Sequence, residues 1–325
     1  MSLNEVVIIR VEASNAIGFG HMVRCFALAD ELSMHARVVF VTKSDSVITA
    51  CKERGLNCFL FKKDVDAIKY LRKNNHSHIN FRIVIDTKSN YTLREVSELQ
   101  SECLGIYFIE NTSPGTMHAD RIIYPAAHFD YDSVYGSLDF SLPPERLIYG
   151  EEFVIIRKEL KEYANHSDGG LVVTTGASDP CGVMLELDKV IASLGIKANF
   201  LIGEKFDFIL KESGRVFGSK YLNYDYKLIA NAETVISTFG VSVYESIFFK
   251  KPTISIAHSH ENAFGSRILA EKLDMVEDLG YYKDLNPSQL QLALDRVSQV
   301  EQPQNSFKID GKGAMRISKI ILGND

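Results

Sequence analysis

A histidine stands where a glycine-containing loop turns into a helix-like run. The stretch that begins at Ile17 reads IGFGHMVRCFALA, with Gly18 and Gly20 just before His21. Glycine allows backbone geometry and close approach that other residues do not. The N–H groups and dipole at a helix N-terminus attract anions and disfavour an imidazolium ion. A neutral ring there can accept a proton, so His21 is a candidate general base. The alternative is a histidine that only bonds the backbone.

Other polar residues accompany this histidine. Arg24 follows one helical turn later, where it can bind an anion or pair with a carboxylate. We predict that Gly18, Gly20, Arg24, Ser14 and Asp86 bind the substrate. The stretch lacks the third glycine of the dinucleotide fingerprint and has no Walker lysine, so it indicates neither site.

A second small-residue turn, TTGASDPCG, covers residues 174–182. Gly176, Ala177, Ser178 and Asp179 come directly before a helix-like run. Such a turn suits a diphosphate, because helix N-termini bind anions. It also suits plain N-capping by Ser178 or Asp179, which this stretch alone favours.

A third turn lies in STFGVSVYESIFFKKP, residues 237–252. Gly240 ends a strand-like run, and Ser242 and Glu245 fall in the opening turn of a helix. One interpretation is a Ser-x-x-Glu capping box. The other is a nucleotide site in which the Glu245 carboxylate takes ribose hydroxyls, since a charged group in a cleft needs a polar partner.

A fourth loop, AHSHEN, contains His258, His260, Glu261 and Asn262. Two histidines and a glutamate are reminiscent of a metal site, but no third well-placed ligand is near. We therefore expect no metal and no other cofactor, and we predict that Glu261 and Asn262 bind the substrate.

Strand-like and helix-like runs alternate in both halves of the chain. The strands are predicted at 6–11, 37–42, 57–61, 81–86, 103–110, 169–175, 198–203, 234–239 and 251–257. Alternation of this kind predicts βαβ units and doubly wound parallel sheets. Two such Rossmann-like domains facing a cleft form the GT-B architecture, and ligands bind at the carboxyl ends of such strands.

The domain boundaries follow from changes in composition. We predict an N-terminal domain at 1–150, an inter-domain segment at 151–169 with a charged helix-like run, a C-terminal domain at 170–307 and a helix at 308–325 that can pack back on the first domain.

The composition is that of a globular protein. The chain has 325 residues, of which 46% are hydrophobic and 24% charged, and its formal net charge of −6 argues against nucleic-acid binding. Five scattered cysteines without metal-type spacing are typical of reduced thiols, and no apolar run is long enough to span a bilayer. We expect a cytoplasmic protein without membrane partners, and the oligomeric state stays open.

Several blocks together resemble one known family. IGFGHMVRCFALADEL resembles the signature of the UDP-sugar hydrolase of the pseudaminic acid pathway, which acts on UDP-2,4-diacetamido-2,4,6-trideoxy-β-L-altropyranose, and of related spore-coat polysaccharide proteins. IYGEEFVIIRKEL, TTGASDP and STFGVSVYESIFFKKP are similar to later blocks of that family, in the same order.

The resemblance implies an enzyme of GT-B fold that releases UDP from a deoxy-amino sugar in surface glycan biosynthesis. His21 would activate water for inverting attack at the anomeric carbon. The turn of Gly176, Ala177, Ser178 and Asp179 would hold the phosphates, with Gly240, Ser242 and Glu245 completing the nucleotide site. No metal is implied.

The chain departs from the family pattern at Glu12, at Glu110-Asn111 and at Glu261-Asn262. These positions are where the sugar should bind. The alternative is a GT-B glycosyltransferase that uses an acceptor hydroxyl, and a second alternative is a non-catalytic protein that binds nucleotide sugars.

Overall fold

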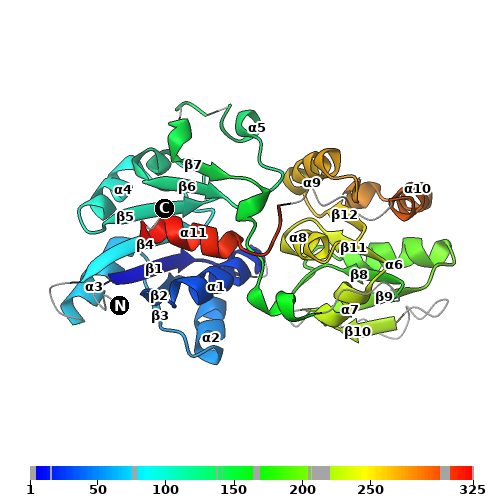
Figure 1. The fold of residues 1–325 in the computed structure, drawn as a ribbon, viewed down its shortest axis with the longest axis horizontal. Coiled ribbons are helices and arrows are strands. Elements are labelled where there is room, and N and C mark those ends of the chain that lie inside the picture. The colour runs from blue at the N-terminus through cyan, green and yellow to red at the C-terminus, as the bar shows by residue number, and fades with distance from the viewer. Residues whose placement is uncertain are drawn as a thin grey trace. The chain divides into compact units, whose positions relative to one another are not determined.

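The structure is a computed structural model that describes residues 5–14, 17–74, 79–136, 138–140, 142–163, 169–203, 206, 220–300 and 308–323. The chain forms two compact units (Figure 1). Unit 1 runs to Ile155 and resumes at Lys312, and unit 2 is Ile156–Gly311. The boundary therefore falls inside the segment 151–169.

Unit 1 contains a parallel sheet in the order β3-β2-β1-β4-β5-β6-β7. Its strands are β1 (Glu5–Val11), β2 (Arg37–Thr42), β3 (Cys58–Leu60), β4 (Asn80–Asp86), β5 (Gly105–Ile109), β6 (Arg121–Tyr124) and β7 (Leu147–Tyr149). Its helices are α1 (Gly20–Leu32), α2 (Asp45–Glu53), α3 (Asp64–Asn74), α4 (Leu93–Gln100), α5 (Tyr131–Tyr135) and α11 (Gly313–Leu322). The central strands read as near-continuous apolar runs, because helices cover both faces of the sheet.

Different helices pack on the two faces of this sheet. Ala67, Ile68 and Leu71 of α3 and Val96 and Leu99 of α4 pack with the apolar side chains of one face. On the other side α1 contacts β1 and β2, and α11 lies along α1. Figure 1 shows α11 in red beside α1 in blue, although the two helices are almost 300 residues apart in the chain. The C-terminal helix is therefore part of unit 1.

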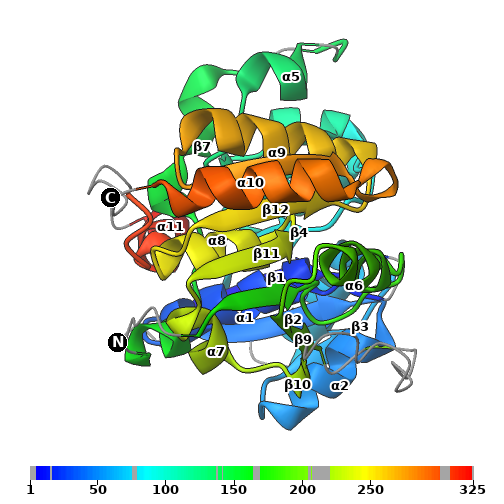
Figure 2. The ribbon, with the colours of Figure 1, turned by 90° about the vertical axis from the view of Figure 1, so that its right-hand side faces the viewer.

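Unit 2 repeats this design with six parallel strands in the order β10-β9-β8-β11-β12-β13. The strands are β8 (Leu171–Thr174), β9 (Ala198–Ile202), β10 (Lys220–Asn223), β11 (Thr234–Thr238), β12 (Thr253–Ala257) and β13 (Val276–Tyr281). The helices are α6 (Val183–Ser193), α7 (Tyr226–Asn231), α8 (Val241–Phe248), α9 (His260–Lys272) and α10 (Pro287–Ser298). Figure 2 shows α9 and α10 against the end of the sheet formed by β12 and β13.

Two parts of the expected element order differ from the structure. The short strands β6, β7, β10 and β13 were not predicted, because most are too short or too mixed in polarity to stand out. The charged run EEFVIIRKELKEY forms no α-helix. It consists of the 3-10 turns Glu151–Phe153 and Lys158–Glu162, joined by an extended stretch whose Val154, Ile155 and Ile156 are buried. Three consecutive buried, β-branched side chains suit extended backbone better than one face of a helix.

Candidate functional site

The predicted base lies where the strand order of the unit 1 sheet reverses. The chain proceeds outward in one direction from β1 and in the other from β4, and these two strands are neighbours. Ligands of doubly wound sheets bind at the carboxyl ends of the strands at this switch point. The loop after β1 leads to His21 in the first turn of α1, and Asp86 is the last residue of β4. The fold thus brings together two residues that are 65 positions apart.

His21 and Asp86 form a hydrogen-bonded dyad. Nδ1 of His21 is 2.6 Å from Oδ1 of Asp86, which is fully buried. Burial alone would raise the pKa of Asp86, but the charges and hydrogen bonds of Arg24 and His21 hold that pKa well below its usual range. An ionised carboxylate only accepts hydrogen bonds, so Nδ1 carries the proton. In the neutral ring this leaves Nε2 as the basic nitrogen.

Arg24 is held by two carboxylates. Its Nε and Nη2 donate to the two oxygens of Asp86, each at 2.7 Å, and Nη1 is 2.7 Å from Oε2 of Glu110. We expected Arg24 to bind the substrate. The structure gives its guanidinium two acidic protein partners instead, so Arg24 orients Asp86 and Glu110 rather than presenting an unpaired charge to a phosphate.

The glycine loop before α1 is shaped by local hydrogen bonds. Gly18 N donates to the Ser14 carbonyl at 2.8 Å, and Ile17 N donates to the Ser14 hydroxyl at 3.2 Å. Gly18 has φ of 86°, a conformation that glycine adopts readily. Gly20 opens α1 behind the N-cap Phe19, and no described side chain caps this end. Ser14 therefore shapes the loop, while the N–H groups at the start of α1 are open to a ligand.

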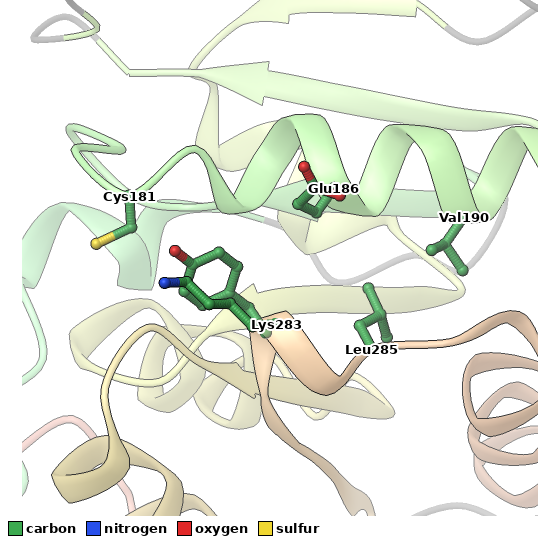
Figure 3. A pocket seen from close by; sticks show the side chains of 6 residues that line it. Cys181, Glu186, Val190, Lys283 and Leu285 are labelled. Carbon is green, nitrogen blue, oxygen red and sulfur yellow. The ribbon is translucent and has the colours of Figure 1, made fainter.

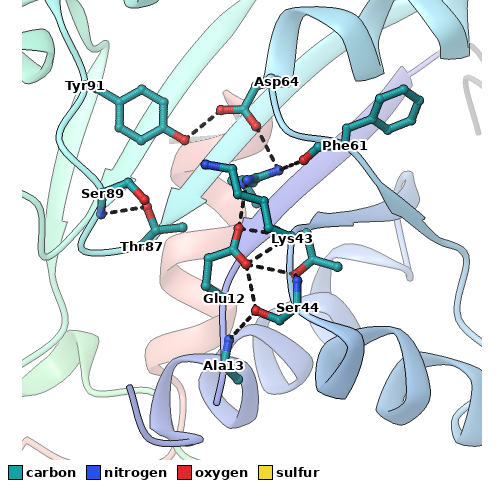
Figure 4. A network of polar contacts seen from close by, with 11 residues as sticks. Glu12, Ala13, Lys43, Ser44, Phe61, Asp64, Thr87, Ser89 and Tyr91 are labelled. Carbon is teal, nitrogen blue, oxygen red and sulfur yellow. Dashed lines mark hydrogen bonds and ion pairs between the residues drawn. The ribbon is translucent and has the colours of Figure 1, made fainter. Parts of the chain in front are cut away.

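Glu12, the first departure from the family pattern, belongs to a network of polar contacts at the start of this loop, next to Ala13 (Figure 4). Its carboxylate accepts from Lys43 N, from the Ser44 hydroxyl at 2.7 Å and from Arg10 at 2.7 Å. Arg10 is 1% exposed and also donates to the Phe61 carbonyl. Glu12 holds the ends of β1 and β2 together, so its carboxylate is not offered to a sugar.

The same network extends to the start of α3. Asp64 is 3.4 Å from Arg10 and accepts from the Tyr91 hydroxyl at 2.6 Å. Burial raises the pKa of Asp64 above its usual value, although the charge of Arg10 opposes this effect. These residues connect α3 and the segment before α4 to the carboxyl end of β1.

The second departure divides into two roles. Asn111 is buried, and its amide donates to the carbonyls of Thr87 and Ser89 while its oxygen accepts from Ser113 N. Glu110 is half-buried and faces Arg24. Asn111 is thus part of the framework, and Glu110 is part of the cluster around His21.

The predicted nucleotide residues lie at the corresponding place in unit 2, where β8 and β11 are neighbours and the strand order reverses. The turn at Gly176 follows β8, and Gly240 follows β11. Gly176 has φ of 80°, and a Cβ there would lie 3.5 Å from the Ser242 hydroxyl, so the two turns are adjacent. Gly203 also approaches the carbonyls of Gly176 and Ala177 so closely that a side chain would collide with them.

Asp179 caps α6. Its two oxygens accept from Val183 N at 2.9 Å and Met184 N at 2.8 Å, which follow the helix N-cap Gly182. Burial raises the pKa of Asp179, and these backbone hydrogen bonds oppose the rise. The capping interpretation of this residue is confirmed. Its carboxylate occupies the N-terminus of α6, and the N–H of Gly176 donates to the Thr174 hydroxyl at 3.1 Å. A phosphate at this turn is therefore left with the backbone of Ala177 and Ser178.

The N-terminus of α8 is open by contrast. Gly240 is its N-cap, and no described side chain caps it. Of the two interpretations of this stretch, the capping box is wrong: Ser242 lies inside the helix, and Glu245 pairs with Arg157. Nη2 and Nε of Arg157 are 2.5 and 3.0 Å from Oε1 of Glu245. Arg157 also stacks over the ring of Tyr226, at 4.5 Å from its centre.

Two buried oxygens in this part of unit 2 lack hydrogen bonds. They are Oε2 of Glu245, a residue 1% exposed, and the hydroxyl of Thr175, next to Gly176. Burial raises the pKa of Glu245 above its ordinary value, and the charge of Arg157 only partly offsets this. Unsatisfied buried oxygens are costly and rare in folded proteins. Sequence reasoning missed Arg157 and Thr175, although both stand within quoted blocks.

The fourth loop contributes mainly to the framework. Ser259 caps α9 by accepting from Asn262 N, and the Asn262 amide donates to the Phe239 carbonyl at 3.1 Å. Asn262 thereby ties α9 to the end of β11. Glu261 and His258 are exposed. Within the described ranges, no group of three or more histidine, cysteine or acidic residues is arranged to hold a metal ion.

A cavity of about 280 Å³ lies elsewhere in unit 2, between α6 and the 3-10 turn Tyr282–Asp284 (Figure 3). Its lining includes Cys181, Glu186 and Lys283. None of the residues predicted to bind the nucleotide lines it. We therefore assign no role in the proposed site to this cavity.

Comparisons with known proteins agree with the fold. No family model matches the chain, and no curated protein matches it by sequence. Among solved structures, MurG of Acinetobacter baumannii has a TM-score of 0.64 at 9% identity and covers 98% of this chain and 99% of its own. A glycotransferase of kitacinnamycin has a TM-score of 0.61 at 10% identity, and the match covers 99% of this chain and 96% of its own. The UDP-GlcNAc 2-epimerase of Methanocaldococcus jannaschii has a TM-score of 0.60 at 11% identity, and the match covers 98% of this chain and 99% of its own.

These likenesses, together with the two parallel sheets, show that the protein has the predicted GT-B fold. At such low identity they show the fold alone. Among the helices of the described residues, none is long and apolar enough to cross a bilayer.

Proposed function

We propose that the protein is a glycosyltransferase that transfers the sugar of a nucleoside diphosphate sugar to an acceptor hydroxyl. The observation that carries the base-assisted attack on the donor sugar is the His21–Asp86 dyad at the switch point of unit 1. Asp86 keeps the proton on Nδ1 and stabilises the imidazolium that forms when Nε2 takes a proton. The named neighbours, MurG and a glycotransferase, favour an acceptor hydroxyl over water.

The reaction then follows from the dyad. Nε2 of His21 removes the proton from the attacking hydroxyl as its oxygen bonds to the anomeric carbon. The bond between that carbon and the diphosphate oxygen breaks, and the diphosphate leaves with the bonding electrons. The proton on His21 returns to solvent after the products depart. A base of this kind contributes typically 10²- to 10⁴-fold to the rate.

Unit 2 supplies groups suited to the nucleotide. The uncapped N-terminus of α8 offers N–H donors to a diphosphate, as does the turn after β8 at Ala177 and Ser178, since the N–H of Gly176 already donates to the Thr174 hydroxyl. The unpaired oxygens of Glu245 and Thr175 can accept hydrogen bonds from ribose hydroxyls. Arg157, now paired with Glu245, offers a positive charge beside the same site.

A hydrolase remains the second candidate, in which water is the acceptor. The block IGFGHMVRCFALADEL favours it through its resemblance to the UDP-sugar hydrolase of the pseudaminic acid pathway. The dyad serves either acceptor, because water and a sugar hydroxyl both lose a proton on attack.

The test measures the release of UDP or dTDP from a panel of UDP- and dTDP-sugars. Each donor is assayed with and without a mixture of sugar acceptors and lipid-linked acceptors. We expect release that depends on an acceptor. Release in buffer alone would favour the hydrolase. Tight binding of UDP in calorimetry without turnover of any donor would favour a binding protein. The absence of both UDP binding and turnover would contradict the proposal.

A further inference from the structure

The cluster around His21 contains a second carboxylate that the dyad alone does not require. Glu110 follows β5, which lies beside β4 on the side away from β1. Its Oε2 is 2.7 Å from Nη1 of Arg24, while Arg24 uses Nε and Nη2 on Asp86. The guanidinium therefore bridges the two carboxylates.

Arg24 opposes proton uptake by the base. Nη2 is 3.0 Å from Nδ1 of His21 and donates to the same Asp86 oxygen that holds the ring. A positive charge at this distance disfavours a second positive charge on the imidazole. Without Glu110, the charges of Arg24 and Asp86 would cancel. Protonation of His21 would then leave a partly buried cluster with a net positive charge.

Glu110 changes this balance. With one guanidinium and two carboxylates, the cluster carries one net negative charge while His21 is neutral and none when it is protonated. Burial alone would raise the pKa of Glu110, but the nearby Arg24 and His21 hold that pKa below its usual value, so the group is ionised.

The backbone of Glu110 is held in a conformation that side chains rarely adopt. Its φ is 48°, in the left-handed region that disfavours residues with a Cβ. Glu110 N donates to the Ile123 carbonyl, and the next residue, Asn111, is fixed by hydrogen bonds to Thr87 and Ser89. Residues whose strained backbone is held in place by the surrounding structure cluster at functional sites.

We propose that Glu110 is a positioning residue that acts through Arg24 and keeps His21 able to accept a proton. This inference rests on the proposed role of His21 as the base. Glu110 offsets the charge that Arg24 brings to Asp86, so that Arg24 can orient the dyad without suppressing the imidazolium.

Other charged residues lie on α1 and on the elements that pack against it. They are Asp30 and Glu31 on α1, Glu5 and Arg10 on β1, Arg37 on β2, Arg316 and Lys319 on α11, its N-cap Lys312, and Arg54, which stacks over Phe26 of α1. Several bind elsewhere: Glu5 pairs with Arg82, Arg10 with Glu12, and Arg316 donates to the Glu152 carbonyl. Asp86 and Glu110 are the carboxylates that contact Arg24 in the described chain.

The test is NMR titration of the His21 ring in the full-length protein, with its signal assigned by loss in His21→Gln. Glu110→Gln removes the charge and keeps the size of the side chain. We expect the titration midpoint to fall by about one pH unit, a tenfold change in the protonation equilibrium, because the imidazolium loses a nearby negative charge. The control Glu98→Gln, from the exposed pair with Arg94, should leave the midpoint unchanged.

A midpoint in Glu110→Gln equal to that of the wild type would overturn the proposal. If that variant does not fold, Glu110→Asn replaces it, since asparagine tolerates the left-handed conformation. With an active donor, the acidic limb of the pH–rate profile should move in the same direction while KM changes little. The titration needs no substrate, so a shift in a protein that turns over no nucleotide sugar would refute the proposed function and support the charge network.

Discussion

The imidazole of His21 is the residue on which the proposed chemistry depends. Replacing it with alanine removes the base but leaves the Asp86–Arg24–Glu110 contacts available. We expect turnover to fall by roughly 10²- to 10⁴-fold. The affinity for UDP should hardly change, because the groups suited to the nucleotide are all in unit 2. Steady-state kinetics and UDP calorimetry measure both quantities, and near-normal turnover would exclude this role for His21.

The ionisation of Asp86 should make the free energy of unfolding depend on pH in acid. Its pKa in the folded protein is lowered, because Arg24 and His21 outweigh the effect of burial. A lowered folded pKa stabilises the protein above the unfolded value, about 3.9, and this contribution is lost as the pH falls further toward the folded pKa. The difference in unfolding free energy between wild type and Asp86→Asn should therefore narrow below about pH 4. Urea unfolding between pH 7 and pH 3 measures it, and a constant difference would contradict the assigned ionisation.

At the scale of elements, the N-terminus of α8 is the predicted diphosphate site. Its N-cap Gly240 has open space where a Cβ would stand. Gly240→Asp places a carboxylate on the free N–H groups, whereas Gly240→Asn introduces the same shape and backbone strain without the charge. We expect the aspartate variant to bind UDP about tenfold more weakly than the asparagine variant, since the helix dipole and amides would already hold an anion.

Isothermal titration with UDP compares these two variants, and equal affinities would place the diphosphate elsewhere. This pair separates the charge from the effect of adding a side chain. The corresponding end of α6 offers no such experiment, because Asp179 already caps it.

At the scale of the whole molecule, unit 1 depends on a helix from the far end of the chain. Ile317 and Ile321 of α11 are fully buried, and the Tyr107 hydroxyl donates to the Ile321 carbonyl. Because α11 packs on α1, we expect Ile317→Ala to destabilise the protein by about 2–5 kcal/mol, the usual range for a large-to-small core change. Lys319→Ala, at an exposed position of the same helix, should change stability by less than about 0.5 kcal/mol.

Chemical denaturation measures both α11 variants. A mild effect of Ile317→Ala, close to that of Lys319→Ala, would show that α11 contributes little to the core of unit 1. Circular dichroism of the folded variants provides the control for intact secondary structure.

The alternation of apolar strands and helices determined the fold class from sequence alone. VVIIRV, RVVFVT and FRIVID are buried on both faces, so hydrophobicity and β-branching suffice to identify them. Local chemistry also favoured a cap at Asp179, since a helix-capping side chain acts within its own turn. The same local reasoning failed at Ser242 and Glu245, where a distant arginine decides the role of the carboxylate.

Tertiary structure decided the contacts between loops. Asp86 could be selected from sequence as a site residue, but its hydrogen bond to His21 exists only because β1 and β4 are neighbours in the sheet. Arg24 pairs with Asp86 and Glu110 for the same reason, because β4 and β5 are also neighbours. Glu12 contacts Ser44 because β1 and β2 are neighbours. Strand order depends on the packing of the whole unit, and no periodicity in the sequence encodes which loops it brings side by side.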